Sequence, residues 1–211
     1  MQCYVFFGIQ GSGKGTQAEL LSRDLNFQHV NIGDLFRDQV SRQTELGQRV
    51  QAVIARGELV SDDLVFEIIG ASLVSGREGI VFDGFPRTLK QAQYLVEHFE
   101  VRQVFFLELE EAVAVARISS RRVCSSCGAN YNLISHSPLH ENVCDLCGGE
   151  LAIRRDDRPE AIAQRLKEYY EQTEVLREFF AGLNILAPID ASGSVTSIAA
   201  SIRKVIHQLE H

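Results

Sequence analysis

Short apolar runs alternate with amphipathic stretches along most of the chain. The runs rich in β-forming residues fall at residues 5–7, 79–83, 104–107 and 185–189. Between them, apolar residues recur at helical spacing, as in residues 18–25. Strands that alternate with helices predict a parallel sheet covered on both faces. We therefore expect an α/β fold whose ligands bind at the carboxyl ends of its strands.

Two segments interrupt this alternation. Residues 31–60 have a helical pattern throughout and contain no predicted strand, whereas residues 122–158 carry few helix signals. We interpret both as insertions that cap the ligand-binding edge of the sheet. A long helix is expected from Pro159, because proline favours the first helical turn and an apolar stripe follows it. The stripe comprises Ile162, Leu166, Tyr169, Tyr170, Leu176, Phe179 and Phe180.

Length and charge narrow the class of protein. The chain has 211 residues, of which 45% are hydrophobic, enough for one core with small inserted subdomains. Its net charge is -7 and it has no long Lys/Arg run, which argues against a nucleic-acid binder. No apolar stretch approaches the length of a membrane span, and a secretion signal is not expected, so we expect a cytoplasmic protein. The final Leu209-Glu210-His211 is equally compatible with native sequence and with a tag remnant.

A phosphate-binding loop is expected at residues 8–14, which fit the pattern G-x-x-x-x-G-K between a strand and a helix. The glycines allow several backbone N–H groups to face one anion, and the helix N-terminus adds its dipole. Lys14 supplies a charge to the β- and γ-phosphates. The loop departs from the general pattern because Gly15, followed by Thr16, replaces the usual hydroxyl residue after the lysine.

Four cysteines predict a structural metal site. The pattern is Cys124-x2-Cys127-x16-Cys144-x2-Cys147. Two such pairs can place four thiolates around a zinc ion, and a closed shell of four sulfurs leaves no position for catalysis. Iron, disulfides, or replacement of one cysteine by His136 or His140 remain alternatives. The fifth cysteine, Cys3, is expected to be a small buried hydrophobic residue.

A small zinc-binding segment can also bind nucleic acid, but the charge of this segment argues against that role. Residues 123–153 contain Glu141, Asp145 and Glu150 but no Lys or Arg, and this local negative charge repels a phosphate backbone.

Further motifs carry a resemblance to a known family. They are Gly-Ser-Gly-Lys-Gly-Thr-Gln at Gly11 to Gln17, Asn-Ile-Gly-Asp-Leu-Phe-Arg at Asn31 to Arg37, Arg-Gly-Glu-Leu-Val-Ser-Asp at Arg56 to Asp62, Asp-Gly-Phe-Pro-Arg-Thr at Asp83 to Thr88, then Gln91, Arg117, Arg121, Arg154, Asp156, Asp157 and Arg165. In this order they resemble the adenylate kinases with a long, metal-containing lid. The resemblance covers essentially the whole chain.

The resemblance implies a three-layer P-loop kinase fold with a five-stranded parallel sheet. Residues 1–30, 61–121 and 159–211 would form the core, residues 31–60 a helical monophosphate-binding insertion, and residues 122–158 the lid with one Zn²⁺. It also implies Mg²⁺-dependent phosphoryl transfer from ATP to AMP, which gives two ADP. Its partners would be these nucleotides alone, with no nucleic acid or membrane, and the enzyme would be a monomer.

The resemblance also implies roles for single residues. The ATP-binding residues would be Gly11, Ser12, Gly13, Lys14, Gly15, Thr16, Arg117, Arg121 and Gly193. The AMP-binding residues would be Ile32, Arg37, Glu58, Leu59, Val60, Gly84, Arg87, Gln91, Arg154 and Arg165. The catalytic cations would be Lys14, Arg87, Arg121, Arg154 and Arg165, because fixed cations stabilise charge on the transferred group. Asp83 would orient the water shell of Mg²⁺, and Asp156 and Asp157 would help to dock the lid.

Several alternatives stay open at this point. Ile32 stands where these enzymes usually have threonine near the adenine of AMP, and Gln10 where many have proline. Because of Ile32, a GTP-using AMP kinase and a pyrimidine monophosphate kinase are alternatives. A nucleotide-binding module without catalysis is a third hypothesis. Near Arg154, a purely structural cluster of salt bridges would also fit the sequence.

Overall fold

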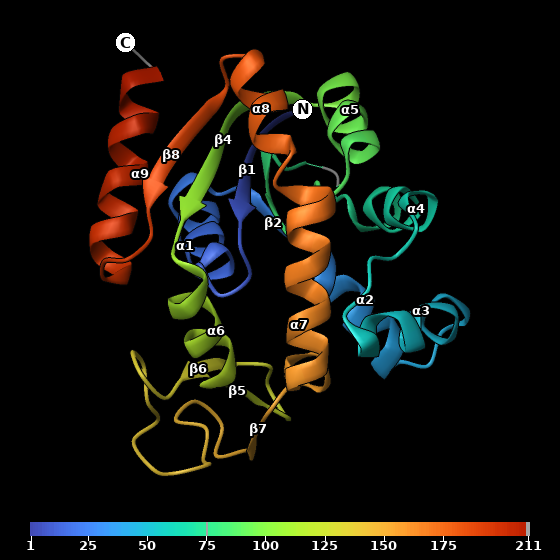
Figure 1. Ribbon diagram of the computed structural model, residues 1–211, viewed down its shortest axis with the longest axis vertical. Helices are drawn as coiled ribbons and strands as arrows, with labels where there is room; N and C mark the ends of the chain where they lie inside the picture. Colours follow the sequence, from blue (N-terminus) through green and yellow to red (C-terminus); the bar gives the residue numbers. More distant parts are fainter. Residues whose placement is uncertain (75, 210–211) are drawn as a thin grey trace.

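A five-stranded parallel sheet forms the centre of the protein (Figure 1). We describe it from a computed structural model, which covers residues 1–74 and 76–209; the tag-like Glu210-His211 lies outside the described residues. The strand order is β2-β3-β1-β4-β8. The strands are β1 (Gln2–Gly8), β2 (Gln28–Asn31), β3 (Gly79–Asp83), β4 (Glu100–Glu108) and β8 (Leu186–Asp190). The expected α/β class with a five-stranded parallel sheet is confirmed.

Helices cover both faces of the sheet because successive side chains of a strand point to opposite sides. In β1, Tyr4 and Phe6 belong to one buried cluster and Val5 and Phe7 to the other. The first cluster is closed by α1 (Lys14–Leu25) and α9 (Val195–Leu209). The second is closed mainly by α4 (Asp62–Ser72), α5 (Leu89–His98) and α8 (Leu176–Gly182). These two clusters make a three-layer molecule.

The segment 31–60 is helical, as expected. It contains α2 (Ile32–Ser41) and α3 (Glu45–Arg56), and only Asn31, the last residue of β2, lies in a strand. Each helix has a side-chain cap that satisfies a backbone N–H of its first turn. Asn31 accepts from the Asp34 N–H at 2.9 Å, and Thr44 accepts from the Gly47 N–H at 3.0 Å.

The cysteine-containing segment forms a separate small sheet, which lies at the bottom of Figure 1. It follows α6 (Glu111–Ser119) and pairs its three short strands antiparallel in the order β6-β5-β7. The strands are β5 (Arg121–Cys124), β6 (Asn130–Asn132) and β7 (Leu151–Ala152), and a 3₁₀ turn, η1 (Arg155–Asp157), ends the segment. In the described residues its buried cluster holds only Cys124, Tyr131, Cys144 and Leu151.

The helix expected from Pro159 to Phe180 is interrupted, so this expectation is corrected. The structure has α7 (Pro159–Glu168), a π-helical segment η2 (Tyr169–Thr173), and then α8. Tyr169 is buried and Tyr170 is 46% exposed, because adjacent residues on a helix point in different directions and only one can face the core. The wider turn buries Thr173, whose hydroxyl donates to the Arg87 carbonyl at 3.0 Å.

The sheet brings the carboxyl ends of its strands to one edge. Asn31 lies beside Asp83, Asp83 beside Phe6, and Glu108 beside Asp190 in the strand register. The loop that follows β1 starts at this edge, between β3 and β4. Within the described ranges, no helix combines the length and apolar character needed to cross a bilayer.

Candidate active site and metal centre

The loop between β1 and α1 is built to hold an anion. Gly11 and Gly13 have positive φ angles of 86° and 93°, and Gly11 packs so closely on α6 that a Cβ there would lie 2.4 Å from the Ala114 carbonyl oxygen. Helix α1 begins directly after the loop, and no side chain caps its N-terminus. The free N–H groups of that first turn therefore remain available to a ligand. The buried Ser12 hydroxyl also has no partner within the described part of the chain.

Lys14 lies over this loop. Its Nζ donates to the Gly8 and Ile9 carbonyl oxygens, both at 2.7 Å. Burial lowers its pKa to about 7, against the opposing attraction of Asp83. A half-buried ammonium whose hydrogen bonds within the described residues go to carbonyl oxygens is poorly compensated, and a phosphate would compensate it.

Five arginines from different elements converge on the same region. They are Arg37 of α2, Arg87 after β3, Arg121 of β5, Arg154 after β7 and Arg165 of α7. Asp157, whose side chain is fully buried, accepts from Arg121 Nε at 2.7 Å and from Arg165 Nη1 at 2.9 Å. Asp156 lies 3.3 Å from Arg37, and Asp34 lies 3.8 Å from Arg154. Five of the six arginines that the resemblance selected as nucleotide ligands are thus brought together, and Arg117 is the sixth.

Positive charge exceeds negative charge in this cluster. With Lys14, the five arginines make six cations, against the four carboxylates Asp34, Asp83, Asp156 and Asp157. Burial and the neighbouring Arg37 and Arg121 lower the pKa of Arg154 to about 10. Neighbouring cations repel one another, and such an excess of positive charge is expected where a polyanion binds.

Arg87 illustrates the imbalance. Its Nε donates to the Gly84 carbonyl at 2.9 Å, and no carboxylate of the described residues forms an ion pair with it. Burial, together with the charge of Arg165, lowers its pKa to about 10. Its guanidinium is therefore the clearest candidate for bidentate binding of a phosphate.

Arg117, which is expected to contact the base of ATP, lies beside the loop that contains Gly193. Arg117 Nη1 donates to the Ala191 carbonyl at 3.0 Å, and Nη2 lies 3.5 Å from the Ser192 carbonyl. The loop leads from β8 into α9 at the same edge of the sheet. Arg117 and Gly193 thus lie close together, and Thr16 is exposed one residue beyond Gly15.

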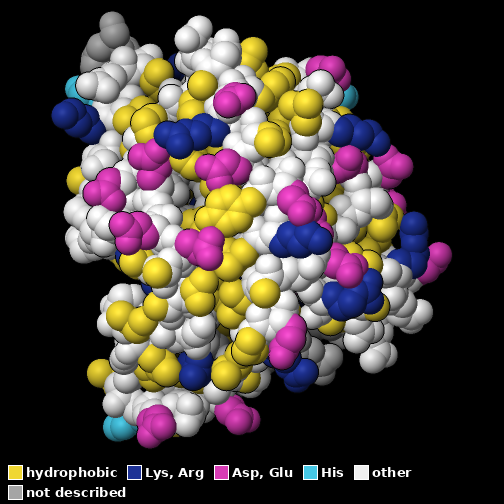
Figure 2. All heavy atoms as spheres, in the orientation of Figure 1, with side chains coloured by type: hydrophobic (Ala, Val, Ile, Leu, Met, Phe, Trp, Pro, Cys, Tyr) yellow, Lys and Arg dark blue, Asp and Glu magenta, His cyan; other side chains and the backbone are white. Residues whose placement is uncertain are grey.

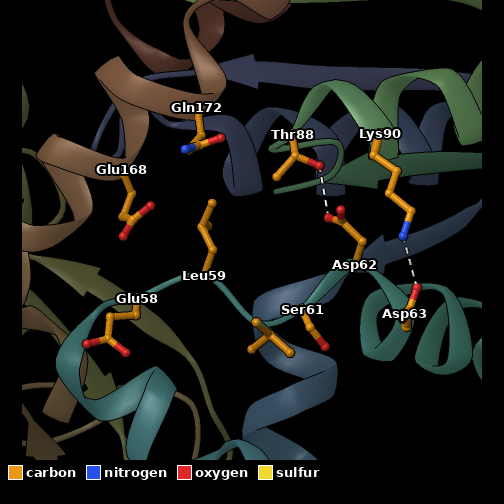
Figure 3. Close-up of a pocket in the computed structure, with 10 residues that line it drawn as sticks. Glu58, Leu59, Ser61, Asp62, Asp63, Thr88, Lys90, Glu168 and Gln172 are labelled. Carbon is orange, nitrogen blue, oxygen red and sulfur yellow. Dashed lines mark hydrogen bonds and ion pairs between the residues drawn. The ribbon is translucent and has the colours of Figure 1, made fainter.

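The expected monophosphate residues fall into two groups. Glu58, Leu59 and Val60 line a cleft of about 560 Å³ that is also lined by residues of α4, α5 and α7, and Figure 3 shows Leu59 between Glu58 and Gln172. Ile32 instead packs into the core with Phe36 and is only 5% exposed, so its side chain faces away from solvent.

Gln91 is fixed by its own neighbours. Its Nε2 donates to Asp62 at 2.8 Å and its Oε1 accepts from the Arg87 backbone N–H at 2.8 Å. Thr88 donates to the same Asp62 oxygen at 2.9 Å (Figure 3). This network ties the segment after β3 to the first turn of α4.

Asp83 lies at the end of β3 beside the phosphate loop and is 4% exposed. Asn31 Nδ2 donates to one of its carboxylate oxygens. A Cβ at Gly15 would lie 3.0 Å from that oxygen, which explains why no larger residue follows Lys14. One carboxylate beside a phosphate site suits Mg²⁺, which keeps several waters and takes few protein ligands.

The four paired cysteines form a compact cluster. Their Sγ atoms all lie within 4.8 Å of one another, with Cys124–Cys147 at 3.4 Å and Cys127–Cys144 at 3.6 Å. Sulfurs bound tetrahedrally to one zinc ion would be about 3.8 Å apart. These separations exceed a disulfide bond of about 2.05 Å, and all four thiols are free. His136 and His140 lie outside this cluster.

Tyr131 supports the cluster from within the small sheet. Its hydroxyl accepts from the Asp145 N–H at 2.8 Å and lies 3.5 Å from Cys144 Sγ. This hydrogen bond lowers the pKa of the Cys144 thiol to about 6. A thiolate is the form that binds metal, and the four clustered Sγ atoms lie close enough together to hold one metal ion.

Three site residues were missed by sequence reasoning. Asn31 holds Asp83, Asp34 pairs with Arg37 at 2.6 Å, and Asp62 holds Gln91. Each stands in a motif that carries the family resemblance, but each is also a common capping or first-turn residue of a helix, so no separate role is predicted for it from the sequence. The strand register that brings Asn31 beside Asp83 is the signal that could have found the first of them.

Comparisons with known proteins give one answer. The family model described as adenylate kinase matches residues 6–185. An adenylate kinase of Thermosipho melanesiensis is 39% identical over 211 residues, which covers 97% of this chain and 99% of that protein. An adenylate kinase of Methanocella arvoryzae is 38% identical (98% and 99% covered), and one of Borrelia turicatae is 37% identical (96% and 97% covered).

Proposed function

Because the chain belongs to the adenylate kinase family of phosphotransferases, we propose that it transfers the terminal phosphoryl group of Mg-ATP to AMP and forms two ADP. The observation that carries this proposal is the cluster of six cations and four carboxylates beside the phosphate loop. A site that only bound one nucleotide would not need cations from both inserted segments. Here Arg37 comes from the insertion 31–60 and Arg154 from the insertion 122–158, and Arg121 is the core residue directly before the second insertion.

The cations divide into three groups in this proposal. Lys14 and the loop N–H groups bind the β- and γ-phosphates of ATP, and Arg121 adds a second contact to them. Arg37 and Arg87 bind the phosphate of AMP. Arg154 and Arg165 lie between the two sides, where they stabilise the charge that develops on the transferred group. The family resemblance and the convergence of these side chains support this division.

Two further groups complete the ATP side. Arg117 lies against the base of ATP beside Gly193. Asp83 orients the water shell of Mg²⁺, and the bound ion would neutralise phosphate charge and orient the phosphates. Glu58, Leu59 and Val60 line the cleft toward which the nucleoside of AMP points, next to the fixed Gln91 and Gly84.

Closure over the site would exclude water. We propose that residues 31–60 and 122–158 move as two lids over a core of residues 1–30, 61–121 and 159–211. Transfer to water would waste ATP, so a site that assembles only when both nucleotides are bound has an advantage. The pairs Arg37–Asp156 and Arg154–Asp34, which connect the two segments above the cation cluster, support this proposal.

The metal in the four-cysteine site is proposed to be one structural Zn²⁺. The small sheet has too few buried apolar residues to be stable alone, and a metal with four thiolate ligands would fold it. Iron is the alternative with the same ligands. We further propose that the enzyme is a cytoplasmic monomer, as the family resemblance implies.

One assay tests the proposed reaction. Pure protein is incubated with Mg-ATP and with AMP, GMP, UMP or CMP in turn, and the diphosphates formed are quantified. Rapid ADP formation with AMP alone is expected, because Ile32 is buried in the core and leaves the monophosphate side unchanged. Faster turnover of another monophosphate would replace AMP by that monophosphate as the proposed acceptor, and repeating the assay with Mg-GTP would test GTP as the donor. No transfer by protein that holds its metal would overturn the proposal in favour of a binding module.

A further inference from the structure

Asn31 connects two groups on which the proposed reaction depends. It is the last residue of β2 and the cap of α2. Its Nδ2 donates to Asp83 Oδ2, while its Oδ1 accepts from the Asp34 N–H at 2.9 Å. One amide therefore holds both the carboxylate at the end of β3 and the first turn of the helix that carries Arg37.

The surroundings leave little freedom to the Asp83 carboxylate. Asn31 and Asp83 are register partners on adjacent parallel strands, so the backbone fixes both residues. No lysine or arginine of the described residues lies within ion-pair distance of Asp83. Gly15 packs against the same oxygen that Asn31 holds, since a Cβ there would lie 3.0 Å from Asp83 Oδ2 and 3.9 Å from Asn31 Nδ2.

A neutral amide suits this position for a chemical reason. It can orient a carboxylate by donating one hydrogen bond without cancelling its charge, whereas a lysine or arginine would compete with a cation for the same group. The second carboxylate oxygen then keeps its lone pairs for the waters of a bound ion. Groups that orient a metal-facing carboxylate in this way tune how well the site binds metal.

We propose that Asn31 is a positioning residue for the metal-bound nucleotide, which acts by fixing the Asp83 carboxylate. This inference rests on the proposed function, because it needs Mg-ATP at the phosphate loop. It also links the metal side of the site to α2, the helix that carries Arg37.

The test uses three variants: Asn31→Ala, Asp83→Ala and the double variant that carries both substitutions. Thr44→Ala is the control. Thr44 caps α3 in the same segment and does not touch Asp83, so its variant reports the loss of a helix cap alone. Two quantities are measured: the Mg²⁺ concentration that gives half-maximal ADP formation, and the affinity for β,γ-methylene-ATP with and without Mg²⁺ by calorimetry. The second quantity needs no turnover.

If Asn31 acts through Asp83, Asn31→Ala should raise the half-maximal Mg²⁺ concentration about tenfold and reduce the gain in analogue affinity that Mg²⁺ provides. Thr44→Ala should leave both quantities unchanged, and the double variant should match Asp83→Ala, because two residues that act as one unit are not additive. Equal shifts in Asn31→Ala and Thr44→Ala, or effects that add in the double variant, would overturn the inference. Failure of the proposed function would instead appear as no ADP formation by the unmutated protein.

A measurement on the unmutated protein covers the case in which the variants fold poorly. The side-chain amide resonance of Asn31 is followed by NMR while Mg²⁺ is added to protein saturated with β,γ-methylene-ATP. A shift of this resonance is expected, because its acceptor faces the ion's water shell. An amide resonance that does not respond to Mg²⁺ would overturn the inference.

Discussion

At the scale of single residues, the site concentrates buried charge that its own carboxylates do not balance. Lys14 donates only to carbonyl oxygens, and Arg87 has no carboxylate partner in the described part of the chain. Burial lowers the pKa of both groups. Such groups are destabilised in the free protein, and an anionic ligand removes that destabilisation.

The first prediction concerns the proton on Lys14. Its pKa is about 7 in the folded protein and 10.5 in an exposed lysine, so the unfolded chain binds more protons between these values. The contribution of this group to folding stability therefore rises with pH through that window. A polyphosphate should raise the pKa again. Binding of β,γ-methylene-ATP at pH 8 should take up about one proton, measured by calorimetry in buffers of different ionisation enthalpy.

The control for this experiment is the same binding measurement at pH 6. At pH 6 Lys14 is already charged, so its share of the proton uptake should vanish. Equal uptake at pH 6 and pH 8 would contradict the assignment of Lys14 as the titrating group.

The second prediction concerns Arg87. Arg87→Ala should lower kcat/KM for AMP about 10²–10³-fold, because it removes a buried donor aimed at phosphate. Arg102→Ala is the matched control, since Arg102 forms an exposed pair with Glu100 at 3.3 Å and lies away from the site. Steady-state kinetics with varied AMP measures both. If Arg87→Ala lowers kcat/KM for AMP by less than about threefold, Arg87 has a structural role only.

At the scale of elements, the sequence predicted what depends on local pattern. Apolar runs marked β1, β3, β4 and β8, but not β2, because in Gln28–Asn31 only Val30 is apolar and the strand depends on pairing with β3. The break at η2 was also missed, since both sides of it have helical periodicity. The glycine and cysteine motifs were located correctly because each requires fixed residue types at fixed spacing.

What the sequence could not predict is which side chains meet. The pairing of Asp157 with both Arg121 and Arg165 joins β5, η1 and α7, and the contact of Asn31 with Asp83 joins two strands. Such contacts between distant parts of the chain follow from the sheet order and the packing of the inserted segments, and no local pattern records them.

The third prediction concerns the small sheet. Cys127→Ser should lose the bound metal and make residues 122–158 sensitive to protease, because their buried cluster is too small to hold them folded. The five-stranded sheet should remain intact. Cys3→Ala is the control, since Cys3 is buried in the main core and lies outside the metal cluster.

Metal content by mass spectrometry and limited proteolysis measure the two effects. Unmutated protein and Cys3→Ala should each hold about one metal ion per chain, as a single four-thiolate site requires. Full metal content in Cys127→Ser would show that the remaining residues suffice and would contradict the four-thiolate site.

At the scale of the whole molecule, ion pairs connect residues 31–60 with residues 122–158 beside the cation cluster. Asp34 of α2 pairs with Arg37 and lies 3.8 Å from Arg154, and Asp156 lies 3.3 Å from Arg37. These carboxylates form ion pairs with arginines that are proposed to bind phosphate groups. On the face shown in Figure 2, by contrast, Lys and Arg side chains are interspersed with Asp and Glu.

The fourth prediction follows from this bridge. Asp34→Asn should shift the ligand-free protein toward more open conformations, because it removes the anion shared by Arg37 and Arg154. Small-angle X-ray scattering should give a larger radius of gyration than for the unmutated protein. The difference should disappear when ATP and AMP analogues supply phosphates in its place.

Asp63→Asn is the matched control. It breaks an exposed pair with Lys90 at 3.0 Å and touches none of the clustered arginines, so the radius should not change. Equal radii for Asp34→Asn and the unmutated protein would show that Asp34 does not hold the segments together.

The negative net charge of the molecule and the positive charge of its cation cluster also affect the rate at which nucleotides reach the site. A net charge of -7 repels ATP and AMP at long range, while the inner cluster attracts them only once they are near. Salt screens interactions beyond about 8–10 Å but affects buried contacts much less. Moderate ionic strength should therefore speed the encounter with nucleotides more than it weakens their final complex.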